Sequence, residues 1–322
     1  MRARLLMLMS VAIAALSLVL AAGHLTYTIK IPTPAHARLK PQLGSYLGVY
    51  EPGFPATYGP MEGFESAAGR RPNLAEYFSG WAEPFKTAFA EALHQHHVVP
   101  LVQIDPTDAL VAQVAAGSYD DYLREYADEV RDFGHPVVIG FAHEMNAPWY
   151  TWGYGHVPAA TFVAAWRHLV QVFRDEGADN VTWLWTIQAD QSRTGPIQDW
   201  WPGKAYVTWV GIDGFLSAPG DTFERTFGHT IAQVREFTSL PVLLSETAVG
   251  PRAGQFAGIK DLFDGMATAK TLGLVWFDAD QSSGVFLQSE DRQDWRLEGK
   301  QFAEIAFRLG IKDDLADPLA GS

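Results

Sequence analysis

Two glutamates in this chain follow apolar runs, at points where an acidic side chain interrupts a hydrophobic pattern. Glu144 comes after residues 137–142, with His143 between, and Glu246 comes after residues 241–244, with one serine between. Two carboxylic acids can cleave a glycosidic bond, because one protonates the leaving oxygen and the other attacks, or directs water at, the anomeric carbon. The two positions therefore predict a pair of carboxylates suited to glycoside chemistry.

The elements that must position these glutamates alternate between apolar runs and amphipathic stretches. Near-continuous apolar runs, typical of parallel strands covered on both faces, predict strands at residues 45–50, 73–78, 98–104, 136–142, 181–187, 207–215, 241–245 and 272–277. Apolar residues at helical spacing predict helices at residues 61–68, 85–97, 119–133, 160–176, 222–237, 256–269 and 301–309.

Eight predicted strands are thus interspersed with seven predicted helices, which predicts an α/β fold, a (β/α)8 (TIM) barrel that forms a single domain over residues 43–312. The competing doubly wound sheet needs a glycine-rich phosphate turn after an early strand, and the sequence has none. Barrel enzymes place their working residues at the carboxyl ends of strands. Glu144 and Glu246 then end the fourth and seventh strands, and Asp213 ends the sixth.

The composition excludes several classes of function. The 322 residues carry 24 Lys and Arg against 37 Asp and Glu, a net charge of −13, which argues against binding to nucleic acid or to an anionic membrane surface. There is no cysteine, which removes disulfides, cysteine zinc sites and iron–sulfur clusters. We expect no cofactor and no metal. The 11 Trp and 11 Tyr indicate an aromatic core or flat platforms for a ring-shaped ligand.

The N-terminus has the pattern of an export segment. Arg2 and Arg4 precede a charge-free run over residues 5–23, which predicts a signal peptide cut after Gly23 or an anchor that tethers the chain to a membrane. Residues 24–42 then form a linker and residues 313–322 a tail. These features predict an extracellular or cell-envelope protein, which we expect to act as a monomer on a polysaccharide.

The residues around both glutamates resemble those of a known family. His143-Glu144-Met145-Asn146, followed by Trp149 and Trp152, is similar to the acid/base signature of glycoside hydrolase family 26, the β-mannanase family. Residues 200–203 and 206–215 resemble the strand-six region of that family, and Ser245-Glu246 resembles its nucleophile strand. The resemblance runs in order from the first predicted strand to the last helix, over residues 43–309.

The resemblance implies a retaining hydrolase of β-linked polysaccharides, with β-1,4-mannan as the first choice of substrate. Glu144 would be the general acid/base and Glu246 the nucleophile. His143 would support Glu144, Trp149 and Trp276 would form sugar platforms, and Asp213 would be a polar partner. Trp185, near the end of the fifth strand, would line the cleft if its face points inward. The residues expected to bind substrate are therefore His143, Asn146, Trp149, Trp152, Trp185, Asp213 and Trp276.

One position departs from the family pattern. Phe215 stands where the family commonly has a tyrosine that hydrogen-bonds the nucleophile, and phenylalanine cannot donate this bond. Gln188 or Ser245 could substitute as the donor to Glu246. Two other functions therefore stay open: a mixed-linkage β-glucanase of the same family, and a weakly active barrel that binds glycan in an envelope polysaccharide complex.

Overall fold

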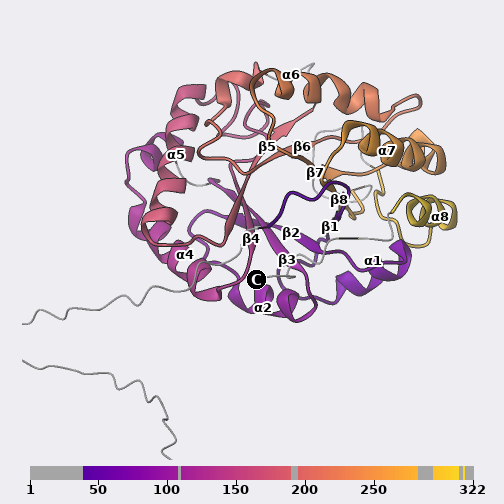
Figure 1. Cartoon of the computed structure of the whole chain (residues 1–322), viewed down its shortest axis with the longest axis horizontal. Coiled ribbons are helices and arrows are strands. Elements are labelled where there is room, and N and C mark those ends of the chain that lie inside the picture. The colour runs from indigo at the N-terminus through magenta and orange to yellow at the C-terminus, as the bar shows by residue number, and fades with distance from the viewer. Residues whose placement is uncertain (1–38, 108–109, 190–194, 282–292, 312–314, 316–322) are drawn as a thin grey trace, which may run out of the picture. The chain divides into compact units, whose positions relative to one another are not determined.

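The computed structural model describes residues 39–107, 110–189, 195–281, 293–311 and 315. Eight parallel strands form a closed barrel in chain order, and β8 closes it by pairing with β1. Helices surround the strands (Figure 1). This arrangement confirms the predicted (β/α)8 barrel.

The strands are β1 (Tyr46–Tyr50), β2 (Leu74–Gly80), β3 (Val99–Asp105), β4 (Val137–Phe141), β5 (Val181–Gln188), β6 (Trp209–Asp213), β7 (Val242–Thr247) and β8 (Gly273–Phe277). The α-helices are α1 (Pro60–Ala68), α2 (Thr87–Gln95), α3 (Val111–Ala115), α4 (Asp120–Phe133), α5 (Ala159–Asp175), α6 (His229–Phe237), α7 (Gln255–Ala269) and α8 (Gln301–Gly310). Every predicted strand overlaps an observed one, and the short α3 was not predicted.

Two helix ends show how local chemistry sets the boundaries. Gly134 follows α4 with φ of 74°, a left-handed conformation that glycine adopts at little cost, and it stops the helix where the sequence predicts. The helix predicted over residues 222–237 is instead a π-helical turn (η2, Glu224–Gly228) that continues into α6.

Side chains fill the barrel in layers. The layer at the amino ends of the strands is apolar and contains Tyr46, Leu74, Val99, Leu101, Val138, Leu184, Trp209, Leu243 and Val275. A second, larger apolar core lies between the strands and the surrounding helices. Both faces of each strand are therefore buried, which explains the near-continuous apolar runs.

The layer above it is polar and depends on glycine. A Cβ at Gly140 would overlap the Gln103 side chain, and a Cβ at Gly211 would lie 2.6 Å from Thr186 Oγ1. The missing side chains leave room for Gln103, whose amide donates to Glu76 Oε1 at 3.1 Å and to Thr186 Oγ1 at 3.3 Å. Buried polar groups therefore lie directly beneath the carboxyl ends of the strands, the end that we call the mouth.

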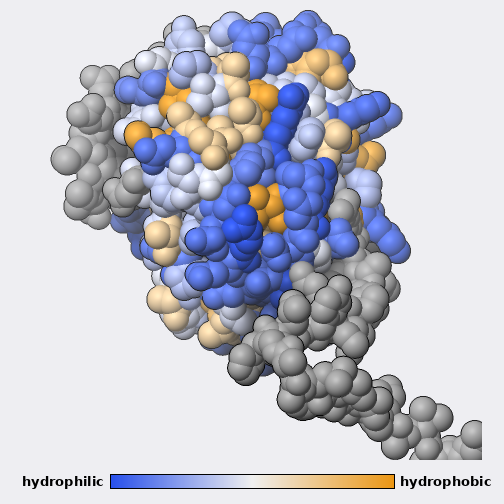
Figure 2. All heavy atoms as spheres, turned by 90° about the vertical axis from the view of Figure 1, so that its left-hand side faces the viewer, coloured by the Kyte–Doolittle hydropathy of each residue, from blue (hydrophilic) through white to orange (hydrophobic). Residues whose placement is uncertain are grey.

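Hydrophilic side chains cover most of the molecular face seen in Figure 2, and apolar residues interrupt them in small groups. Within the described ranges, no helix is long and apolar enough to cross a membrane. The predicted export segment and the linker up to residue 38 lie outside the described residues, as does most of the predicted tail.

Candidate active site

Glu144 lies in a tight turn directly after β4. Ala142 and Glu144 both have φ of 51°, in the left-handed region that residues other than glycine rarely adopt. The turn is held by backbone hydrogen bonds from Ala142 to Ile104 (2.9 Å) and from Glu144 to Thr186 (3.0 Å). It brings His143 to the end of β3 and Glu144 to the end of β5. Strained residues of this kind cluster at functional sites.

Two donors hold the Glu144 carboxyl group. Trp149 Nε1 donates to Oε2 at 2.6 Å, and Gln188 Nε2 donates to Oε1 at 2.8 Å. Asn146 fixes the backbone of Gln188 by two hydrogen bonds of 2.9 Å, one to its carbonyl and one from its amide. Asn146 is fully buried, so in this structure it positions a neighbour of Glu144.

His143 is buried beside Glu144 between two partners. Its Nδ1 lies 2.8 Å from Asp105 Oδ1, and its Nε2 lies 3.1 Å from the Tyr150 hydroxyl. Burial alone would lower the pKa of His143, but the negative charges of Asp105, Glu144 and Glu246 raise it to about 9. The imidazole is therefore positively charged at neutral pH and sits next to the glutamates.

Asp105 is a site residue that the sequence analysis missed. It is the last residue of β3, where a polar side chain follows an apolar run, so the rule that found Glu144 would also have found it.

A β-bulge sets the direction of Glu246. Gly211 pairs with Leu243, but Asp213 pairs with Glu246, so β7 contains one extra residue at this point. Ser245 points into the barrel and donates to Asp213 Oδ1 at 2.6 Å. Simple alternation would send the next residue to the outer face, but the bulge turns partly exposed Glu246 to the mouth.

The charges of the carboxyl groups at the mouth shift one another's pKa values. Burial raises the pKa of Asp213, and the charges of Glu246 and then Glu144 raise it further. Burial also raises the pKa of Glu246. The charge of Glu144 raises this pKa further, and the charge of His143 lowers it. The protonation of each of the three carboxyl groups therefore depends on the charge of the others.

Hydrogen bonding distinguishes the two glutamates. The pKa of Glu144 is raised by burial and lowered by the charge of His143 and by its bonds from Trp149 and Gln188. Among the described residues, no side chain donates a hydrogen bond to Glu246. The two substitutes considered for the family tyrosine are engaged elsewhere: Gln188 with Glu144, and Ser245 with Asp213. Phe215 packs on Phe277 and Trp295 instead.

One predicted tryptophan lies at the mouth. Trp149 is 42% exposed while its indole nitrogen bonds Glu144, so it offers an aromatic surface beside the carboxyl group. Trp152 is buried, donates to the carbonyl of His143 at 2.9 Å and stacks on Tyr150. The predicted contact of Trp152 with substrate is wrong, because this ring supports the turn from below.

Trp276 and Trp185 are corrections to the predicted site. Trp276 is fully buried in the helix layer, where it packs on Phe307 of α8 and donates to the carbonyl of Trp295. Trp185 is fully buried against Trp201 and Phe237. Both residues lie at outward positions of their strands, so neither lines the cleft.

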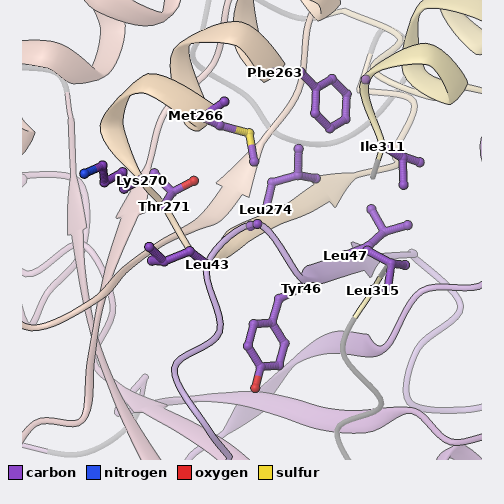
Figure 3. Close-up of a pocket in the computed structure, with 14 residues that line it drawn as sticks. Leu43, Tyr46, Leu47, Phe263, Met266, Lys270, Thr271, Leu274, Ile311 and Leu315 are labelled. Carbon is purple, nitrogen blue, oxygen red and sulfur yellow. The ribbon is translucent and has the colours of Figure 1, made fainter. Parts of the chain in front are cut away.

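The described ranges contain no group of three or more His, Asp or Glu side chains that could hold a metal ion. A pocket of about 320 Å³ lies at the opposite end of the barrel, where Tyr46, Leu274, Phe263 and Met266 line it (Figure 3). Because the working residues of barrels lie at the mouth, we do not assign this pocket to the reaction.

A second acid pair lies at the ends of β1 and β8. Glu51 and Asp278 are both buried, and Asp278 Oδ1 accepts a hydrogen bond from the Leu297 amide at 2.7 Å. The pKa of Glu51 is raised to about 9, mainly by burial and then by the charge and the hydrogen bond of Asp278. The charge of Glu298 raises this pKa further, and the charge of Arg296 lowers it. At neutral pH the pair therefore shares one proton.

We expect Glu51→Gln to stabilise the protein at alkaline pH. The folded state holds the Glu51 proton far above the pH at which an unfolded glutamate loses it, so the contribution of the pair to stability falls as the pH rises towards 9. The amide keeps a donor for Asp278 and does not titrate. The Tm of the variant minus that of the wild type should therefore increase from pH 5 to pH 9.

Thermal unfolding at several pH values measures this difference, with Glu125→Gln on the exposed face of α4 as the control. The same difference at every pH would show that the pair does not share a proton.

Comparisons with known proteins agree with the geometry of the mouth. Residues 103–243 match the model of "Glycosyl hydrolase family 26". This range contains β4 to β6 and so includes Glu144, Gln188 and Asp213. Glu246 lies just beyond it.

Several curated proteins are similar in sequence. Endoglucanase H of Acetivibrio thermocellus is 23% identical over 80% of this chain, which spans only 29% of that protein. β-1,3-Xylanase TXYA of a Vibrio species is 29% identical over 51% of the chain and 36% of that protein. Mannan endo-1,4-β-mannosidase A and B of Caldalkalibacillus mannanilyticus is 29% identical over 40% of the chain and 26% of that protein.

Among solved structures, the catalytic domain of a Bacillus endo-β-1,4-mannanase has the same fold. Its TM-score is 0.62 at 14% sequence identity, and the alignment covers 89% of this chain and 95% of that one. The signature at β4, the family model and these relatives agree, and the chain is similar to glycosyl hydrolase family 26 over residues 103–243.

Proposed function

We propose that the chain is a retaining β-glycoside hydrolase that cuts within β-linked polysaccharides. One observation carries this proposal: Glu144 and Glu246 face the same mouth, at the ends of β4 and β7, beside the exposed ring of Trp149. A pair of carboxyl groups flanked by an aromatic surface suits the cleavage of a bond between sugar rings.

The reaction proceeds in two displacements. Glu246 attacks the anomeric carbon and forms a glycosyl–enzyme bond, while Glu144 transfers its proton to the leaving oxygen. Glu144, now ionised, takes a proton from water, and this water attacks the anomeric carbon and releases Glu246. Both steps need one proton shared by the pair, which the raised pKa values of the two groups support.

We propose β-1,4-mannan as the first substrate and mixed-linkage β-glucan as the alternative. The relatives carry three different names, for a mannan endo-1,4-β-mannosidase, an endoglucanase and a β-1,3-xylanase, and two of these names specify a β linkage. The exposed rings of Trp149 and Tyr154 at the turn after β4 suit an extended chain of sugar rings.

The purified protein should be assayed on mannan, glucomannan, lichenan and β-1,3-xylan. We expect new reducing ends from mannan and glucomannan, with a rapid fall in viscosity that marks internal cuts. Hydrolysis of lichenan alone would transfer the assignment to mixed-linkage glucan. No hydrolysis of any of the four polymers would contradict the proposed activity.

A second candidate is a weakly active barrel that binds glycan in an envelope polysaccharide complex. The specific observation in its favour is that Glu246 accepts no hydrogen bond from the described side chains while Glu144 accepts two. The same four polymers separate the candidates, because a binder would retain mannan on an affinity gel without cutting it.

We also propose that the protein is exported. Arg2, Arg4 and the charge-free run over residues 5–23 support this proposal. Expression of the full chain in its own cells, followed by fractionation, should find the protein in the envelope or the medium. Recovery from the cytoplasm alone would contradict it.

A further inference from the structure

A nucleophilic carboxylate in this mouth needs a hydrogen-bond donor. Glu246 lies among Glu144, Asp213 and Asp105, and burial and negative charge both favour its protonated form, which cannot attack. The nearby donors are used by other groups. Gln188 and Trp149 donate to Glu144, Ser245 donates to Asp213, and the Tyr150 hydroxyl pairs with His143.

Tyr50 is a side chain of the mouth whose hydroxyl is not engaged by another described residue. It is the last residue of β1, in register with Glu76 of β2 and with Phe277 of β8. Its ring stacks on Phe277, with centroids 4.8 Å apart and planes 12° apart, and meets Phe78 edge-on at 5.3 Å. The ring is therefore held in place, while its hydroxyl makes no hydrogen bond to the described residues.

The electrostatics of Tyr50 couple it to Glu246. Burial is the main cause that raises the pKa of Tyr50, to about 12, and the charge of Glu246 is the next. The charge of Glu246 raises the pKa of Tyr50 more than the charge of Glu76, its register partner, or of Glu51, the next residue in the chain. The hydroxyl therefore lies in the electric field of Glu246 and keeps its proton at neutral pH.

We propose that the Tyr50 hydroxyl is the positioning group of Glu246: it donates the hydrogen bond that orients the carboxylate and stabilises its ionised form during the reaction. This inference rests on the proposed hydrolase function. Hydrogen bonds of this kind are commonly long in a free site and shorten when substrate binds.

This bond decides which glutamate holds the shared proton. In the free mouth, Glu144 accepts two hydrogen bonds and Glu246 accepts none from the described residues, so the negative charge favours Glu144. A donor on Glu246 moves the charge to Glu246 and leaves the proton on Glu144. Each group then has the protonation state that its role requires.

The test is Tyr50→Phe, which keeps the stacked ring and removes only the hydroxyl. We expect kcat on mannan to fall about 10²-fold with KM nearly unchanged, because the carboxylate is no longer held at the angle of attack. The acidic limb of the kcat profile should also move to higher pH by about one unit, since a hydrogen bond to a charged group stabilises the ionised form.

Tyr46→Phe is the matched control, because Tyr46 lies on the same strand and its hydroxyl bonds the Lys40 carbonyl at the other end of the barrel. Its pH profile should match that of the wild type. Thermal unfolding of both variants reports any loss of stability, which lowers the amount of active protein without moving the acidic limb. If the wild type is active and Tyr50→Phe has the same kcat and the same acidic limb, this inference alone is overturned. If the wild type is inactive on all four polymers, both the proposed function and this inference are overturned.

Discussion

Glu246→Ala should abolish turnover on every substrate, with a loss of about 10⁴-fold or more in kcat. The alanine has no oxygen with which to attack the anomeric carbon, so no glycosyl–enzyme bond can form, however good the leaving group is. Steady-state assays on mannan and on an aryl β-glycoside measure this loss.

The fold should survive the Glu246 substitution. Glu246 is partly exposed and carries a raised pKa, so its ionised form is costly to bury. We therefore expect the variant to unfold at the same temperature as the wild type or above it. Retention of more than about one hundredth of wild-type kcat on the aryl glycoside would show that another group is the nucleophile.

Glu144→Ala should separate the two steps of the reaction. Without the acid, hydrolysis of mannan should fall by about 10²- to 10⁴-fold, because the sugar leaving group needs a proton. An aryl group such as dinitrophenolate leaves without one, so the first step should stay fast while the second, which needs the base, becomes slow. Rapid mixing should show a burst of aryl release equal to the amount of enzyme.

The pH profile offers a check on the same variant. The charge of Glu144 raises the pKa of Glu246, so its removal should lower the pKa of the nucleophile. The acidic limb of the burst rate should therefore shift to lower pH. Equal losses in Glu144→Ala and Glu246→Ala on the aryl substrate would mean that the two roles are wrongly assigned or reversed.

The barrel could be predicted from the sequence because its strands are buried on both faces. Each strand appears as a near-continuous apolar run, and each predicted run overlaps an observed strand. The positions of Glu144 and Glu246 followed from the same pattern, since both interrupt such a run close to its carboxyl end. Their chemical roles remain a proposal that the variants above test.

The tryptophans show where the pattern was insufficient. A strand buried on both faces has no polar side to mark its inward positions, so the sequence could not show that Phe277 faces the mouth and Trp276 the helices. The same ambiguity placed Trp185 in the cleft. The register with neighbouring strands resolves it, because Phe277 stacks on Tyr50 across β1 and β8.

The direction of Glu246 was also beyond the sequence. Strict alternation puts Ser245 and Glu246 on opposite faces, and only the bulge in β7 brings Glu246 beside Asp213 while Ser245 stays inside. Donor assignments depend on such details. Gln188 was a candidate partner of Glu246, and the turn after β4 brings Glu144 to it instead.

The stereochemistry of the first product tests the central claim most directly. Proton NMR of a mannan digest, recorded within the first minutes, distinguishes the two anomers at the new reducing end before mutarotation mixes them. Two displacements through Glu246 and Glu144 predict that the β-anomer, with the configuration of the cleaved bond, appears first. The α-anomer appearing first would contradict the account, because it requires a single attack by water.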